Sequence, residues 1–249
     1  MALVEALTRG VRVLLVTGRR PPAARQVAEQ IVPELPMVAN NGGLLIEAGA
    51  IVRRRPLPRA LAREAVTIGK ACAADPVVHS GMNGEGHLLV EAGAPGQTLR
   101  AYYVDSSNPA VVMFEGLEAA IVEDPIQVMF GGEIASMDAL LPRLLSSLGA
   151  AVNIERTIYP ALGMGLIDVM AAGVAKGEAV GFFESRWGLE ASATLAIGDN
   201  WNDRGMLERA GLGFVMGNAD PAMHRLGLGV LPSNEDDGVA VAIEKHVLK

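Results

Sequence analysis

A cluster of carboxylate and amide side chains follows a short apolar run in the C-terminal part of the chain. The run Thr194–Ile197 has the composition of a buried β-strand and stops at Gly198. The cluster directly after it consists of Asp199, Asn200, Asn202 and Asp203. Ligands of open α/β sheets bind outside the carboxyl ends of the strands, and oxygen atoms of this kind suit a hard cation such as Mg²⁺. The cluster is therefore a candidate Mg²⁺ site; the alternative interpretation is an Asx-rich turn that caps the next helix.

A second candidate group lies near the N-terminus, at the end of the nearly unbroken apolar run Val11–Thr17. Such a run is typical of a strand buried on both faces in a parallel sheet. It leads into Gly18 and Arg19, and Pro21 then opens a helix. Free backbone N–H groups and a hydroxyl at this point would form an anion site, and Arg19 could reach a phosphate. The alternative is an ordinary strand-to-helix turn with a solvated arginine.

The third candidate is Lys176, which directly precedes a helix expected over Gly177–Trp187. A cation at a helix N-terminus has the wrong sign for the helix dipole, which costs up to ~1 kcal/mol. The position is easier to explain if carboxylates or a bound phosphate hold the ammonium group. A surface lysine is the alternative.

The elements that would position these residues form two groups. Apolar runs alternate with helical patterns over residues 1–55 and 165–249, which predicts an α/β domain with a parallel sheet. One of its strands is expected at Leu166–Met170. Residues 56–164 contain helices and many short strands, which predicts an inserted α+β unit. Its expected strands lie near Val77, Leu88, Tyr102, Val111, Ile121 and Val128, and the segment Asp105–Asn108 is interpreted as a loop of this unit.

The composition excludes several classes of protein. The chain has 249 residues, of which 21 are Lys or Arg and 28 are Asp or Glu, so its net charge is −7. This charge argues against nucleic acid as a partner. The single cysteine, Cys72, excludes an internal disulfide and is typical of a reducing compartment. No apolar run approaches the ~20 residues of a membrane span, and the N-terminus lacks the pattern of a signal peptide, so we expect a cytoplasmic protein with no membrane partner.

These motifs stand in an order that resembles the haloacid dehalogenase-like (HAD) hydrolases, specifically the Cof-type phosphatases with a large inserted cap. The segment Val13–Arg19 resembles the second motif of the family, and Ala39–Gly43 resembles its Asn-Gly turn. Ile167–Gly177 resembles the third motif and Gly198–Leu207 the fourth. The resemblance covers nearly the whole chain. It implies an α/β fold with a Rossmann-like core and parallel sheet, residues 1–55 and 165–249, and an inserted α+β cap, residues 56–164.

The resemblance implies Mg²⁺-dependent hydrolysis of small phosphorylated metabolites, such as sugar phosphates, through an aspartyl-phosphate. Mg²⁺ is the implied cofactor, and the protein is expected to be a monomer or a homodimer. The family pattern gives Asp203 two possible tasks, orienting Lys176 or supporting a metal-bound water. It implies catalytic roles for Thr17, Lys176 and Asp203, substrate or phosphate binding by Gly18, Arg19, Asn41 and Asn202, and metal binding by Asp199 and Asp203.

The sequence departs from the family at its first motif, Asp-x-Asp-Gly-Thr, which is absent. In the family this motif supplies the nucleophile and the general acid, and its strand lies between the strands that end here at Thr17 and Ile197. We therefore expect Met1 to be an internal residue of a longer protein, the first strand to be missing, and these 249 residues alone to be inactive. Without that strand the two neighbouring strands would have open edges. The alternative is a non-catalytic phosphate-binding or regulatory protein of the same fold.

Overall fold

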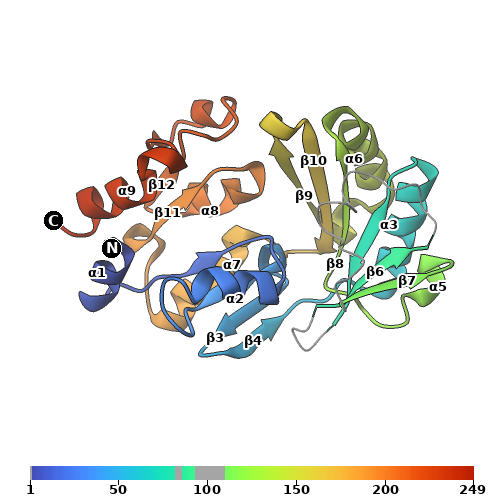
Figure 1. Ribbon diagram of the computed structural model, residues 1–249, viewed down its shortest axis with the longest axis horizontal. Helices are drawn as coiled ribbons and strands as arrows, with labels where there is room; N and C mark the ends of the chain where they lie inside the picture. Colours follow the sequence, from blue (N-terminus) through green and yellow to red (C-terminus); the bar gives the residue numbers. More distant parts are fainter. Residues whose placement is uncertain (1, 82–85, 93–109) are drawn as a thin grey trace. The chain divides into compact units, whose positions relative to one another are not determined.

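The computed structural model describes residues 2–81, 86–92 and 110–249 (Figure 1). The chain forms two compact units. The core unit comprises Met1–Arg19, Ala23–Val52 and Ala175–Lys249, and the inserted unit comprises Arg20–Pro22 and Arg53–Val174. The chain returns from the inserted unit to the core unit after Val174, whereas the sequence boundary was placed after residue 164. In the described part of the chain, no helix has the length and apolarity that crossing a bilayer requires.

The core unit contains its strands in two separate sheets. The first has the order β1-β2-β3-β4, in which β1 runs parallel to β2 and β2 antiparallel to β3. The second has the order β11-β12-β13, with all three strands parallel. Among the described residues, no strand pairs with the outer edge of β1 or of β11. The strands are β1 (Leu15–Val16), β2 (Met37–Ala39), β3 (Leu44–Glu47), β4 (Ala50–Arg54), β11 (Leu195–Gly198), β12 (Leu212–Val215) and β13 (Gly229–Val230).

The apolar run Val11–Thr17 forms a much shorter strand than expected. Only Leu15–Val16 is a strand, and Val11 is 36% exposed. The expectation of a long strand buried on both faces was wrong. In the described structure β1 pairs only with β2, and β2 is itself a strand of three residues, Met37–Ala39, so the ladder between them is short.

Helices and apolar side chains join the two sheets of the core unit. Leu14 and Val16 pack against one cluster that contains Val215 of β12 and against another that contains Val38 of β2. The two sheets are thus connected through side-chain packing, while the described strands form no ladder between them. The helices of this unit are α1 (Ala2–Thr8), α2 (Pro21–Ala28), α7 (Lys176–Trp187), α8 (Arg204–Arg209) and α9 (Gly238–His246).

The inserted unit is a sheet of six strands in the order β7-β6-β5-β8-β10-β9. Its strands are β5 (Pro76–His79), β6 (Leu88–Glu91), β7 (Val111–Phe114), β8 (Gln127–Glu133), β9 (Val152–Tyr159) and β10 (Met164–Ala171). The helices α3 (Arg59–Ala71) and α6 (Ile134–Leu148) pack on one face, where Val66 and Leu140 meet Phe130 in the main apolar cluster. A short helix, α5 (Leu117–Ala120), follows β7.

Two sequence expectations in this unit need correction. The strand at Leu166–Met170 was assigned to the core sheet, but as β10 it pairs with β8 and β9 in the inserted unit. Ile121 was expected in a strand, whereas it lies after α5 and buries its side chain in the main cluster. The expected strand near Tyr102 and the loop at Asp105–Asn108 lie outside the described residues.

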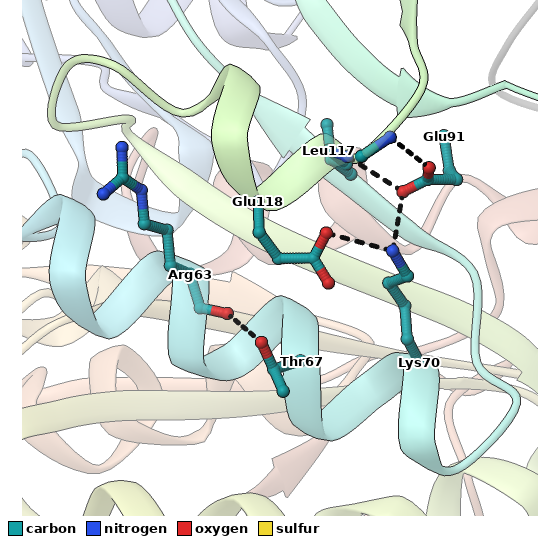
Figure 2. A network of polar contacts seen from close by, with 7 residues as sticks. Arg63, Thr67, Lys70, Glu91, Leu117 and Glu118 are labelled. Atoms are coloured by element: carbon teal, nitrogen blue, oxygen red, sulfur yellow. Dashed lines mark hydrogen bonds and ion pairs between the residues drawn. The ribbon is translucent and has the colours of Figure 1, made fainter.

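A carboxylate at the end of β6 holds the start of α5 and the end of α3 together (Figure 2). Glu91 accepts hydrogen bonds from the backbone N–H groups of Gly116, at 2.7 Å, and Leu117, at 3.0 Å. Lys70 Nζ lies 2.9 Å from Glu91 and 3.0 Å from Glu118. Burial alone would raise the pKa of Glu91, but Lys70 and the two backbone donors outweigh it and hold that pKa below its usual value.

We expect Glu91→Gln to lower the free energy of unfolding by about 1–3 kcal/mol at neutral pH, because the ionised carboxylate is the acceptor for three donors. A lowered folded-state pKa gives stability that is present above the unfolded pKa and lost as the pH falls through the folded value. Urea denaturation at several pH values should therefore show the difference from wild type shrinking in acid. Glu208→Gln breaks an exposed pair with Arg204 and serves as the control, with at most about 0.5 kcal/mol lost. Equal losses in the two variants would contradict the interpretation.

Candidate phosphate-binding site

A buried ion pair lies at the N-terminus of α7. Lys176 is the first residue of the helix, and its Nζ lies 2.6 Å from Oδ1 of Asp203. The two side chains are 7% and 5% exposed. A buried ammonium at a helix N-terminus is unfavourable by itself, so the carboxylate compensates both for the desolvation and for the helix dipole.

The second oxygen of Asp203 is held by the backbone. Oδ2 accepts hydrogen bonds from the N–H groups of Asp199 and Asn200, each at 3.1 Å. Asn200 and Asp203 form a capping box at the start of this turn. A Cβ at Gly198 would lie 2.5 Å from the Cβ of Asp203, so only glycine leaves room for the carboxylate. Both oxygens of Asp203 are thus engaged, which suits a group that orients Lys176 better than a direct metal ligand.

Asp199 lies beside this pair at the end of β11 and is exposed. Partial desolvation and the nearby charge of Asp203 raise the pKa of Asp199, and Lys176 opposes that rise. A carboxylate that is destabilised by a like charge favours a cation nearby. Among the described residues no three His, Cys, Asp or Glu side chains gather as a metal-binding group. The donor set therefore fits Mg²⁺ only as an ion that takes one carboxylate and completes its shell with water and phosphate oxygens.

Three residues from different strand ends meet beside the ion pair. Asn202 Nδ2 donates to Asn41 Oδ1 at 3.0 Å, and both side chains are buried. Asn41 adopts a left-handed conformation, with φ of 54°, in the turn after β2. A Cβ at Gly18 would lie 2.9 Å from Asn41 Oδ1, so Gly18 allows the close approach of this amide. Asn202 Oδ1 is buried and has no hydrogen-bond partner within the described structure, which leaves an acceptor for a bound donor.

The turn after β1 is joined to the same network through its backbone. Thr17 Oγ1 accepts a hydrogen bond from Arg19 N at 3.1 Å, and the Thr17 carbonyl accepts one from Asn41 N at 3.1 Å. Arg19 is exposed. Gly42 brings the turn against α7, since a Cβ there would lie 2.8 Å from the carbonyl oxygen of Ala175.

The two interpretations of the Asp199–Asp203 cluster do not exclude each other. The segment is a helix cap, through Asn200 and Asp203, and the same cap holds Lys176 and leaves Asp199 exposed. The cap can be recognised in the sequence, because an Asn stands three residues before an Asp.

Gly42 has a positioning role that was not expected from the sequence. No local pattern indicates that this glycine approaches the backbone of Ala175.

Known proteins resemble this chain, some over most of its length and others over a part of it. Residues 1–243 match the haloacid dehalogenase-like hydrolase family. The chain is 26% identical over 242 residues to the 5-amino-6-(5-phospho-D-ribitylamino)uracil phosphatase YbjI of Escherichia coli, covering 97% of this chain and 84% of that protein. A putative phosphatase of Haemophilus influenzae is 39% identical over 79 residues, which cover 32% of this chain and 30% of that protein. The sugar phosphatase BT4131 shares the fold, with a TM-score of 0.79 at 19% identity over 98% of this chain and 88% of that one.

We expect Asp199→Asn to raise the melting temperature at neutral pH without added metal, because it removes a carboxylate whose ionised form is disfavoured by desolvation and by the charge of Asp203. A raised folded-state pKa means that ionisation of Asp199 opposes folding above that pKa, so the gain should vanish in strong acid. Millimolar MgCl₂ should raise the melting temperature of the wild type and leave the variant unchanged. Asp236→Asn, at an exposed site outside the network, is the control. A variant that melts lower than wild type would refute the electrostatic account.

Proposed function

The chain belongs to the haloacid dehalogenase-like hydrolases, and from this premise we propose that its core unit binds the phosphoryl group of a small phosphorylated metabolite in a Mg²⁺-dependent phosphatase. Sugar phosphates are the proposed class of substrate. The phosphatase names of the relatives support the reaction type, and the oxygen- and nitrogen-rich network of the core unit supports phosphate as the group that is bound.

The observation that carries the proposal is the buried Lys176–Asp203 pair. An ammonium group has three donors, and Asp203 Oδ1 takes one of them, so the others can donate to phosphoryl oxygens. Because Asp203 is fixed by two backbone N–H groups, the ammonium is oriented before a ligand arrives. A preorganised positive charge is most effective where negative charge develops on a phosphoryl group.

The remaining residues have proposed roles around this charge. Thr17 and the backbone at Gly18 would donate to phosphoryl oxygens, and Arg19 would add a positive charge at the exposed side. Asn41 and Asn202 would contact the substrate, since Asn202 Oδ1 can accept a hydrogen bond from a bound group. Asp199 would hold Mg²⁺, and the bound ion would supply further neutralisation of phosphoryl charge.

The proposed hydrolysis also needs a nucleophile and a general acid. These 249 residues contain no two aspartates separated by one residue. We therefore propose that they bind phosphate but do not hydrolyse phosphate esters by the aspartyl-phosphate route on their own. The same observation favours a second candidate function, a non-catalytic phosphate-binding or regulatory protein.

A binding titration and a hydrolysis assay together test these proposals. We expect inorganic phosphate to bind the wild-type chain in isothermal titration calorimetry. Lys176→Met should weaken binding by about tenfold to a hundredfold, because a charge-assisted hydrogen bond is lost. The exposed Lys245→Met is the matched control and should leave the affinity unchanged.

Hydrolysis of an aryl phosphate with and without Mg²⁺ separates the two candidates. The assay compares this chain with the protein translated from any in-frame codons upstream. Metal-dependent turnover in the longer protein alone supports the phosphatase, and binding without turnover in either form supports the regulatory role. Turnover by this chain itself, lost in Asp199→Ala, would contradict the proposal that it lacks a nucleophile.

A further inference from the structure

A second ion pair joins α7 and α8 at the ends opposite to the candidate site. Glu184 of α7 is 5% exposed, and its Oε2 accepts a hydrogen bond from Arg209 Nε, on α8, at 2.7 Å. Its Oε1 accepts one from the hydroxyl of Thr194 at 2.8 Å. Both oxygens of this buried carboxylate are engaged, as both oxygens of Asp203 are.

Between the two ion pairs the helices touch through glycines. A Cβ at Gly177 would lie 2.7 Å from the carbonyl oxygen of Gly205, so the helix backbones approach directly. A Cβ at Gly181 would lie 2.7 Å from the guanidinium carbon of Arg209, so this side chain passes over α7 at a glycine. This close packing allows little sliding of one helix along the other.

The helix α7 contributes the positive charge to one ion pair and the negative charge to the other. At the first pair α7 carries the cation and the chain before α8 carries the anion; at the second, α7 carries the anion and α8 the cation. Moving α8 along α7 by one turn would break both pairs and leave the charges of Glu184 and Lys176 buried without their ion-pair partners, which is strongly unfavourable. The helix α8 has only six residues, too few to hold its own position, so it depends on such contacts.

We propose that Glu184 and Arg209 are positioning residues that fix α8 on α7 and thereby keep Asp203 at the ammonium group of Lys176. Neither residue contacts the candidate phosphate position. They act on the Lys176–Asp203 pair by fixing the position of α8 on α7. Their importance for phosphate binding rests on the proposed function, whereas their effect on the Lys176–Asp203 pair does not.

The test observes the ammonium group directly. In ¹⁵N-lysine spectra of the full chain at low temperature, an ammonium held in a buried ion pair exchanges its protons slowly enough to be seen. The Lys176 signal is assigned by its absence in Lys176→Arg. We expect it in the wild type and in Arg209→Lys, which retains the charge, and we expect it to be lost in Glu184→Gln and Asp203→Asn. Glu208→Gln, an exposed residue of the same helix, is the matched control and should retain the signal.

Phosphate titration of the same variants adds a functional measurement. Glu184→Gln should weaken inorganic phosphate binding by about tenfold, the lower end of the effect that loss of a supporting partner has at metal sites, and Arg209→Lys should stay close to wild type. If Glu184→Gln does not fold, Arg209→Met is used instead, because it breaks the same ion pair by changing its more exposed partner. A retained Lys176 signal in a folded variant without the Glu184–Arg209 pair overturns the proposal. Loss of the signal in a protein whose wild type binds no phosphate supports the positioning role and refutes the proposed function alone.

Discussion

The buried pair of Lys176 and Asp203 is the interaction on which the rest of the candidate site depends. A lysine ammonium with 7% of its side chain exposed is strongly unfavourable in the protein interior without a partner, and Asp203 is the partner that the fold provides. The surrounding features follow from this requirement. Gly198 leaves room for the carboxylate, and the capping turn at Asn200 supplies the N–H groups that hold its second oxygen. The helix that carries Lys176 packs closely enough on α8 to keep the two groups together.

The sequence predicts the local parts of this arrangement well. A lysine at the start of a helix has the wrong sign for the dipole, which predicts a nearby carboxylate or phosphate, with a surface lysine as the alternative. The Asn200–Asp203 turn is visible because a capping box spans only four residues, and the α/β fold follows from the alternation of apolar runs and helical patterns. What the sequence does not give is the choice of partner. Lys176 and Asp203 are 27 residues apart, and Glu184 and Arg209 are 25 apart, so their pairing depends on how two helices cross.

The wrong predictions also concern pairing between segments that lie far apart in the sequence. The segment Leu166–Met170 is a strand, as its apolar residues indicate, but the composition of an apolar strand does not show which sheet it joins. Its ladder with β8 and β9 is set by the connection through β9, which the periodicity did not identify as a strand. The length of β1 likewise depends on its neighbours. The largely apolar run Val11–Thr17 favours an extended conformation, but the number of its residues that remain in a ladder is decided by the partner strands.

The division of the core sheet has a consequence for cooperativity. Backbone ladders couple strands directionally, whereas the two halves of the core unit are coupled by apolar packing of Leu14 and Val16, which is non-directional. Each half can therefore open with a local free energy of its own, below that of global unfolding. The hydrogen bond between Asn202 and Asn41 joins one half to the other. The binding network is consequently intact only while both halves are folded, so its lifetime is set by the less stable of the two.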